Sequence, residues 1–181
     1  MMPAGRTPRV RAALGSDSAA LAEIYSHYVL RGLASFELDP PDAAEMAHRR
    51  AYVTGLGLPY LVAEIGGRIA GYAYAAPYRT RPAYRFTVED SIYVHHDFLG
   101  RGVASALMPQ LIAACETAGC RQMIAVIGDS DNQPSIMLHQ KFGFSRVGLL
   151  PAVGWKFGRW VDSVLMQRQL GAGTSQPPAG A

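Results

Sequence analysis

The sequence has few cysteines and no apolar run long enough to cross a bilayer. Its two cysteines, Cys115 and Cys120, are too few for a disulfide framework and do not form a metal-ligand pattern. We expect packed thiols and no metal. The first ten residues, MMPAGRTPRV, lack the continuous apolar core of a secretory signal. A cytoplasmic protein without a membrane partner is therefore expected.

Charge is sparse and dispersed. Charged residues make up 17% of the chain, and the formal net charge is +3. The 17 lysines and arginines form no long basic run. Without a basic helix or a stacked array of aromatic side chains, we expect no nucleic-acid partner. Binding of a local anionic ligand explains the positive net charge as well as binding of nucleic acid would.

Length and composition favour one globular domain. A chain of 181 residues that is 49% hydrophobic can bury a substantial core but is short for two ordinary domains. The small and polar ends predict a flexible N-terminal tail over 1–8 and a flexible C-terminal tail over 171–181. A single domain is expected over 9–170.

The hydrophobic pattern predicts a mixed α/β (α+β) fold. Gly66 and Gly67 form a two-residue hairpin connection, and a strand, a glycine-rich turn, a helix and a strand follow in the order of a crossover unit. Pro109 predicts a bend in the crossover helix. The expected strands are 8–14, 60–65, 68–76, 84–94, 121–128, 144–150 and 159–170. The expected helices are 21–30, capped by Ser16 or Asp17, then 42–55, about 103–119, and 134–142.

The turn FLGRGVAS, residues 98–105, has two interpretations. Gly100 and Gly102 allow backbone angles that a side chain forbids, so the segment could be a tight entry to a helix. Exposed amides at a helix start, with the positive end of the helix dipole, also suit a phosphate group. The turn alone does not decide between these two interpretations.

Three sequence segments that follow one another in a set order decide between these two interpretations. TVEDSIYV with GRGVA, then AVIGDSDNQPSIMLHQKFGF, then VGWKFGRWVDSVLMQ resemble the GNAT superfamily of acetyl-CoA-dependent N-acetyltransferases. Within it they resemble the phosphinothricin acetyltransferase group, whose members also act on methionine sulfone and methionine sulfoximine. The likeness covers roughly Arg9 to Gly171. It implies a central mixed, twisted sheet of six to seven strands flanked by helices on both faces, acetyl-CoA as co-substrate, and commonly a homodimer.

The resemblance also implies cofactor contacts. The amides of the glycine-rich turn bind the pyrophosphate of coenzyme A, and the backbone at the end of the central strand pairs with the pantetheine arm. Leu99 stands where the superfamily usually has Gln or Arg, so we expect weaker binding and leave open whether Arg101 replaces that contact. For Asn132 and Ser135, helix capping is the alternative. The implied cofactor-binding residues are Ile92, Tyr93, Val94, Gly100, Arg101, Gly102, Val103, Ala104, Ser105, Asn132 and Ser135.

Two residues carry the implied chemistry. Glu89 matches the general base of the resembling group, and His139 stands where many members of the superfamily have a tyrosine acid. A free amine of pKa near 8 would give its proton to an ordinary Glu at a cost of roughly 5 kcal/mol, so burial must raise the carboxyl pKa or water must relay the proton. Whether His139 acts as acid or base stays open. Asp90 is expected on the opposite face of the strand and is not favoured.

The acceptor side of the site is expected upstream of Glu89. The resemblance assigns substrate contact to Arg85 and Thr87, and strand alternation would place both on the face of Glu89. It also places Phe36 and Glu37 in the acceptor pocket. The Tyr93 amide is the expected oxyanion donor. His95 and His96 are interpreted as part of a solvated loop.

These interpretations converge on one activity. We expect acetylation of the α-amine of a small amino acid or analogue by direct transfer in a ternary complex, because neither cysteine is placed as a nucleophile. A non-catalytic acyl-CoA sensor, or a GNAT enzyme acting on a protein amine or a polyamine, is the alternative. Retention of both Glu89 and His139 counts against the sensor.

Overall fold

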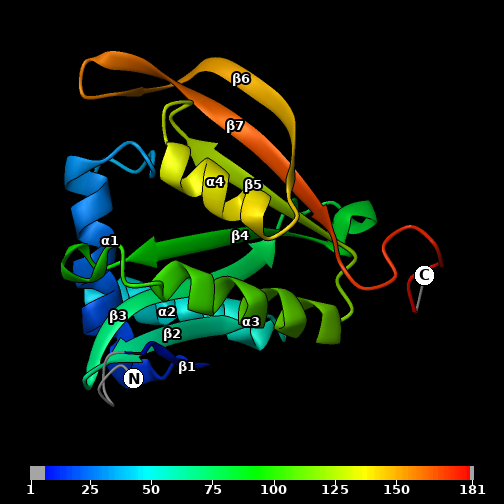
Figure 1. Cartoon of the computed structure of the whole chain (residues 1–181), viewed down its shortest axis with the longest axis horizontal. Coiled ribbons are helices and arrows are strands. Elements are labelled where there is room, and N and C mark those ends of the chain that lie inside the picture. The colour runs from blue at the N-terminus through cyan, green and yellow to red at the C-terminus, as the bar shows by residue number, and fades with distance from the viewer. Residues whose placement is uncertain (1–6, 180–181) are drawn as a thin grey trace.

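A seven-stranded sheet forms the centre of the computed structural model, which describes residues 7–179 (Figure 1). The strand order is β1-β2-β3-β4-β5-β7-β6, and β4 with β5 is the parallel pair. The strands are β1 Arg9–Ala12, β2 Tyr60–Ile65, β3 Arg68–Pro77, β4 Thr87–Val94, β5 Gln122–Gly128, β6 Ser145–Lys156 and β7 Arg159–Gln169. The α-helices are α1 Ser18–Arg31, α2 Ala43–Gly55, α3 Val103–Thr117 and α4 Gln133–Lys141. This is the mixed α/β architecture that the sequence predicts.

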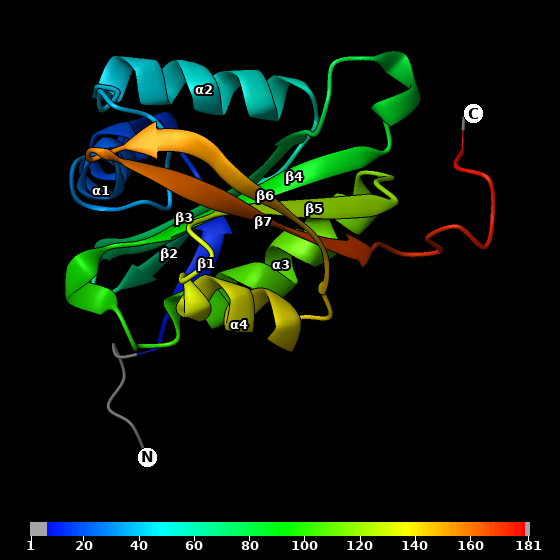
Figure 2. The ribbon, with the colours of Figure 1, turned by 90° about the horizontal axis from the view of Figure 1, so that it is seen from above.

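The helices cover both faces of the sheet (Figure 2). One apolar cluster packs α1 and α2 against β2 and β3 around Leu21, Ile24 and Tyr72. The other packs α3 and α4 against the opposite face around Leu107, Leu111 and Met123. Side chains of β4 alternate between the two clusters, so Val88 belongs to the α3 side and Tyr93 to the α1 side.

The central strands β4 and β5 separate after a short pairing. Their register runs from Thr87 opposite Gln122 to Asp90 opposite Ala125. Beyond that point β4 continues to Val94 along β3, and β5 continues to Gly128 along β7. Figure 1 shows the two arrows diverging. The separation leaves an edge of β4 without a neighbouring strand inside the sheet.

Local sequence explains most element boundaries. The carboxylate of Asp42 accepts a hydrogen bond from the Glu45 amide at 2.8 Å and caps α2. Asp17 is the residue before α1, but its carboxylate binds Arg11 and the Leu14 amide instead of capping the helix. The helix α3 is continuous through Pro109, whose side chain is exposed.

Two strand boundaries differ most from the prediction. The strand expected over 84–94 begins at Thr87, because Pro82–Tyr84 forms a 3-10 turn and Arg85 keeps helical angles. The strand expected over 144–150 extends to Lys156 and turns through Phe157 and Gly158 into β7. Both turn residues have positive φ, which suits the two-residue hairpin.

The predicted tails lie partly outside the described residues, because residues 1–6 and 180–181 are not described. Within the described C-terminal segment, the Gly171 amide donates to Glu116 at 3.1 Å, and Arg121 donates to the Pro177 carbonyl at 3.2 Å. None of the described helices is both long and apolar enough to span a membrane.

Candidate active site

A cavity of about 420 Å³ lies where β4 and β5 separate. Its walls are residues 89–93 of β4, residues 125–128 of β5 and the loop 34–37. Single residues of α1, β3 and β7 complete it, together with two residues of α4 and the residue that caps this helix. Because the cavity lies between diverging strands, it is lined by side chains from both faces of the sheet. Glu89 and Asp90, which point to opposite faces, therefore both reach it.

Glu89 lies on the α1 side of β4 and is half-buried. Burial raises the pKa of its carboxyl, and the charge of Asp90 raises it further, while Arg79 acts in the opposite direction. A raised pKa of this carboxyl lies closer to the pKa of an amine, so transfer of a proton from the amine to the carboxylate costs less free energy. The arrangement suits direct proton transfer to Glu89.

His139 comes from α4 and is buried. Its Nδ1 lies 2.7 Å from the Ser135 carbonyl oxygen, and its Nε2 lies 3.0 Å from Asp90 Oδ2. Burial acts to lower the pKa of His139, but the hydrogen bond and charge of Asp90 outweigh it and the pKa is raised. Asp90 points to the face opposite Glu89, as predicted, yet it contacts a predicted catalytic residue and lines the cavity.

The loop 34–37 forms the other wall. Burial raises the pKa of Tyr25 to about 12, so its hydroxyl stays protonated and donates to Glu37 at 2.9 Å. Arg49 also donates to Glu37, at 2.7 Å. Phe36 lies so close to Gly128 and Gly154 that a Cβ at either glycine would meet its ring. The sequence-predicted residues Phe36 and Glu37 thus line the cavity.

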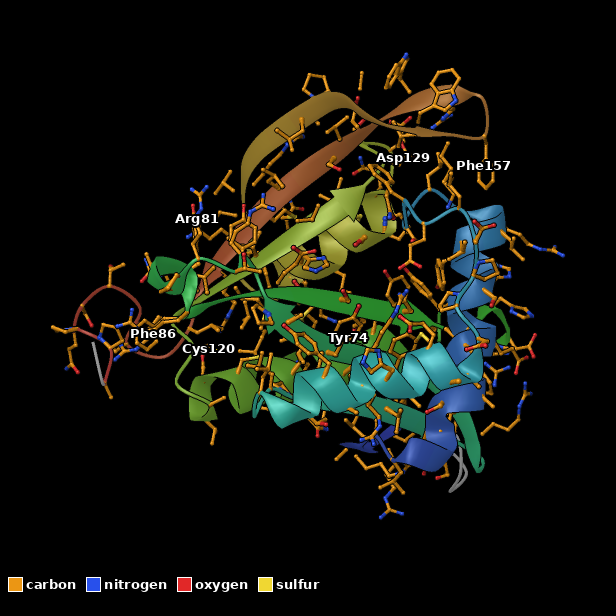
Figure 3. All side chains as sticks on the ribbon, turned by 180° about the vertical axis from the view of Figure 1, so that it is seen from behind. Tyr74, Arg81, Phe86, Cys120, Asp129 and Phe157 are labelled. Atoms are coloured by element: carbon orange, nitrogen blue, oxygen red, sulfur yellow. The ribbon has the colours of Figure 1, made fainter. Side chains whose placement is uncertain are left out.

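Lys156 connects this loop to the β6–β7 hairpin. Its ammonium donates to the Ser35 carbonyl at 2.6 Å in a buried position, and burial lowers the pKa of Lys156. Trp160, on the same hairpin, is 63% exposed and packs against Trp155. Figure 3 shows Phe157 at the tip of this hairpin.

Arg85 does not share a strand face with Glu89, which corrects the prediction from alternation. It precedes β4, is exposed, stacks on the Phe86 ring and donates to the Pro82 carbonyl at 3.3 Å. Thr87 is the first residue of β4 and is half-buried. Neither residue lines the cavity.

The glycine-rich turn leads directly into α3. Gly100 and Gly102 have φ of +73° and +76°, and an added Cβ would meet no atom within 4 Å at either position. Backbone conformation, not crowding within the chain, is therefore the reason for glycine here. The first amides of α3, from Val103, Ala104 and Ser105, have no acceptor within the helix.

The side chains of this turn make different contacts. Arg101 lies over the Phe98 ring, 5.3 Å from its centre, and Leu99 is 60% exposed. The Ser105 hydroxyl accepts a hydrogen bond from Lys141 at 3.3 Å. The turn therefore offers backbone amides rather than a side chain at position 99.

The amides of Ile92 and Val94 lie at the open edge of β4. The His95 amide donates to the Ala70 carbonyl on the β3 side, so alternation directs Tyr93 toward β3 as well, and Ile92 and Val94 toward the gap. The Tyr93 amide, which is the expected oxyanion donor, thus points toward β3, whereas the Ile92 amide points toward the gap. At Val94 the Tyr28 hydroxyl accepts from the amide at 3.3 Å and donates to the carbonyl at 2.6 Å.

Asn132 and Ser135 lie at the start of α4. The Asn132 side chain accepts from the Ser135 amide at 3.3 Å and caps the helix, which is the alternative considered for it. Both residues also line the cavity. A capping role and a ligand contact are compatible at these positions.

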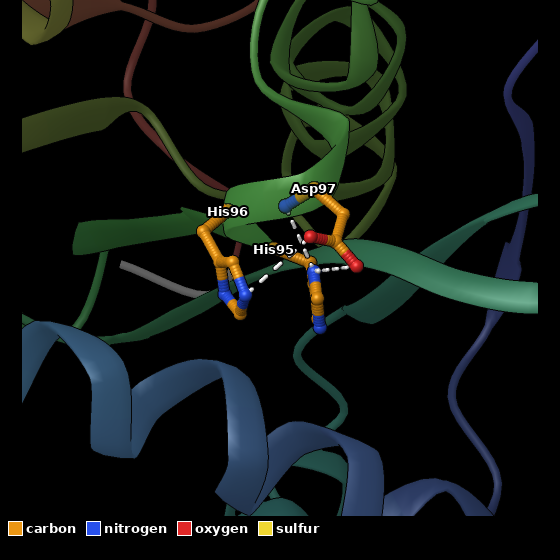
Figure 4. Close-up of side chains that lie close together, drawn as sticks. All are labelled: His95, His96 and Asp97. Carbon is orange, nitrogen blue, oxygen red and sulfur yellow. Dashed lines mark hydrogen bonds and ion pairs between the residues drawn. The ribbon is translucent and has the colours of Figure 1, made fainter.

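His95 is buried, contrary to its interpretation as solvated. Figure 4 shows it beside His96 and Asp97. Its Nδ1 accepts from the Asp97 amide at 3.1 Å, and its Nε2 faces Glu23 at 3.4 Å. His95, His96 and Asp97 are close enough to be considered as metal ligands, within 4.8 Å of one another. The Asp97 amide already occupies the Nδ1 lone pair of His95, so the cluster has a structural explanation.

Sequence reasoning missed several cavity residues. Tyr25, Tyr74 and Ser163 contribute to its lining from α1, β3 and β7. Tyr74, labelled in Figure 3, stands opposite Ser91 in the β3–β4 register. Nothing in their local sequence distinguishes them from ordinary core residues, because they are placed by the tertiary arrangement of the strands.

Comparison with known proteins gives a consistent result. The family model "Acetyltransferase (GNAT) family" matches residues 21–144. A phosphinothricin N-acetyltransferase of Alcaligenes faecalis is 53% identical over 169 residues, covering 93% of this chain and 86% of that protein. An L-methionine sulfoximine/L-methionine sulfone acetyltransferase of Salmonella typhimurium is 38% identical over 164 residues, covering 89% and 94%.

A solved structure shows the same fold. The GNAT superfamily phosphinothricin acetyltransferase from Sinorhizobium meliloti, in complex with AcCoA, superposes with a TM-score of 0.93 at 46% identity. The superposition covers 97% of this chain and 95% of that one. With the diverging central strands and the glycine-rich turn described above, these likenesses establish that the chain belongs to the acetyltransferase (GNAT) family.

Proposed function

We propose that the protein transfers an acetyl group from acetyl-CoA to the α-amine of a small amino acid or analogue of the phosphinothricin, methionine sulfone or methionine sulfoximine type. The observation that carries the proposal is Glu89, a half-buried carboxyl with a raised pKa in the cavity between β4 and β5. The names of the similar proteins support this acceptor class.

The chain offers acetyl-CoA a main-chain site. Amides of residues 100–105 bind the diphosphate at the start of α3, where the helix dipole is positive. The open edge of β4 receives the pantetheine arm by completing the sheet, and Tyr28 leaves the Val94 backbone when that arm binds. The Ile92 amide faces the gap and is the proposed donor to the carbonyl oxygen.

The transfer is direct. The amine nitrogen forms a bond to the thioester carbon, Glu89 takes the amine proton, and the carbon–sulfur bond breaks to release the thiolate. Cys115 and Cys120 are buried in the core cluster on the α3 side, and neither lines the cavity. They do not form a covalent intermediate in this proposal.

Charge pairing favours an acceptor with one amine. Three carboxylates line the cavity: Glu37, Glu89 and Asp90. Arg49 pairs with Glu37 and His139 pairs with Asp90. Among the described residues, Glu89 forms no ion pair, which suits a single amine better than a polyamine. Arg85 and Thr87 remain the proposed substrate contacts, and Arg85 must leave Phe86 to reach the cavity.

The β6–β7 hairpin carries the proposed homodimer contact. It exposes a row of large apolar side chains, and a surface of this kind is typical of an interface. These side chains are Val147, Leu149, Leu150, Val153, Trp155, Phe157 and Trp160. A cytoplasmic location is part of the proposal, supported by the two cysteines that are free and buried.

An acceptor panel tests the activity. Purified protein, acetyl-CoA and each amine are incubated, and thiol release is followed. We expect turnover with phosphinothricin, methionine sulfone and methionine sulfoximine, and much lower kcat/KM with spermidine or a peptide amine. Acetyl-CoA binding without turnover on any amine would instead support the sensor alternative.

Removal of the base tests the chemistry. Glu89→Gln is expected to lower kcat/KM by about 10² to 10⁴-fold, because the amine loses its proton acceptor. Acetyl-CoA affinity should change little. In the parent protein kcat/KM should rise as the pH rises through the raised pKa of Glu89, since the base acts when deprotonated. Glu116→Gln, on the exposed side of α3, is the control and should behave like the parent.

Two matched glycines test the turn. Gly102 and Gly57 have φ of +76° and +73° with no atom within 4 Å of an added Cβ. Alanine at either position should cost about 1 kcal/mol of unfolding free energy. Only Gly102→Ala should also weaken coenzyme A binding, by about 1.5 kcal/mol or roughly tenfold in calorimetry. If the two variants bound coenzyme A with equal affinity, the diphosphate could not bind at this turn.

The dimer is tested by charge on the hairpin. Trp160→Glu should convert a dimer to a monomer in light scattering, because a carboxylate cannot be buried against apolar partners without a large cost. Leu56→Glu introduces the same charge at an exposed leucine that follows α2 and should leave the mass unchanged. A parent protein that is monomeric at micromolar concentration would contradict the proposal.

A further inference from the structure

The two ring nitrogens of His139 both face hydrogen-bond acceptors. The Ser135 carbonyl oxygen, 2.7 Å from Nδ1, has no hydrogen to donate, and the Ser135 hydroxyl, which could donate, lies farther away at 3.5 Å. The shorter contact therefore requires a proton on Nδ1. The Asp90 Oδ2 atom lies 3.0 Å from Nε2, and this contact needs a second proton on one of the two atoms. The pair therefore holds one proton more than a neutral imidazole beside a carboxylate.

Burial and charge decide where that second proton lies. The side chains of His139 and Asp90 are 3% and 1% exposed. The other oxygen of Asp90, Oδ1, has no hydrogen-bond partner among residues 7–179. Among the described residues, His139 is the only basic side chain in contact with this buried carboxylate. An imidazolium is also a much weaker acid than a carboxylic acid, with reference pKa values of about 6.5 and 3.9, so the proton belongs on Nε2.

We propose that Asp90 is a positioning residue that holds His139 as a doubly protonated imidazolium in the cavity. This inference rests on the proposed function only for the consequence in catalysis. With both N–H groups donated, His139 cannot accept the amine proton, which leaves that task to Glu89. The cation instead supplies fixed positive charge near the thioester, where negative charge develops on the carbonyl oxygen and then on sulfur.

The groups around the ring support this assignment. From β4, Asp90 contacts Nε2, while Glu89 extends to the opposite face. From α4 itself, Ser135 contacts Nδ1. From the segment before β6, the Phe144 ring packs edge-on with ring centres 4.9 Å apart and adds no charge. Asp90 is the one charged group in contact with the imidazole among the described residues, and it favours the protonated form, consistent with the raised pKa of His139.

Nitrogen-15 spectroscopy of the histidine rings tests the proposal in the parent protein. Full-length protein labelled in histidine is recorded from pH 6 to pH 8, and the His139 signals are assigned by their loss in His139→Gln. We expect both ring nitrogens to remain in the protonated range across this interval. A neutral ring at pH 7, with one nitrogen unprotonated, would overturn the proposal without any need for a variant at Asp90.

The variant Asp90→Asn tests the positioning role. An asparagine amide can donate to Nε2, so the ring is expected to become a neutral tautomer protonated on Nδ1. The kcat/KM for acetyl transfer should fall on the order of 10²-fold, with little change in acetyl-CoA affinity. A variant in which His139 stays doubly protonated would overturn the proposal, and so would unchanged turnover.

A matched control separates local from general effects. Asp97→Asn removes a carboxylate that lies beside two other histidines, with Asp97 Oδ1 3.5 Å from His96 Nε2. It should leave the His139 signals unchanged. If Asp90→Asn does not fold, the spectrum of the parent protein still decides. If no amine is acetylated while the His139 signals are as expected, the proposed function fails and the Asp90–His139 assignment stands.

Discussion

The short parallel pairing of β4 with β5 is the constraint on which the site depends. Four residues of β4 pair with β5 before the strands separate, each held by its other neighbour in the sheet. Because the strands diverge, the backbone groups of Ile92 and Val94 have no partner strand on that side, and Tyr28 occupies those of Val94. Side chains of both sheet faces also reach one cavity. If β4 and β5 paired along their whole length, those backbone groups would be satisfied within the sheet. The side chains of Glu89 and Asp90 would then lie on opposite faces of a closed sheet and would not share a cavity. The opening in the sheet thus creates both the edge proposed for the cofactor and the cavity that holds the proposed catalytic residues.

Charge in this cavity is organised by partners from other elements. Arg49 of α2 neutralises Glu37, and His139 of α4 pairs with Asp90, while Arg79 affects Glu89 only at a distance. Glu89 therefore experiences mainly burial, which raises its pKa toward that of an amine. The same burial that would be unfavourable for an isolated carboxylate makes this one a better proton acceptor. Two adjacent residues of β4 thus have different chemistry because they face different sides of the sheet.

The sequence predicts local features better than it predicts the tertiary arrangement of the cavity residues. Periodicity gives the strand and helix order, Gly66 and Gly67 give a hairpin, and alternation correctly separates Glu89 from Asp90. It fails at Arg85, because the turn at Pro82–Tyr84 delays the strand and the alternation does not extend back to it. The role of Asp90 could not be read from TVEDSIYV, since its partner lies 49 residues away on another element. Only the tertiary fold brings the carboxylate and the imidazole together.

The turn at residues 98–105 shows why Leu99 is compatible with a cofactor site. A side chain that donates to phosphate adds a contact, but the positive φ of Gly100 and Gly102 already directs successive amides outward at the start of α3. Main-chain donors are held by the helix and lose little conformational freedom on binding, whereas a long exposed side chain must be ordered first. In the proposed binding mode, the departure at Leu99 therefore removes an auxiliary contact and leaves the principal main-chain contact in place. Arg101, which belongs to the turn and lies over the Phe98 ring, places a positive charge within it.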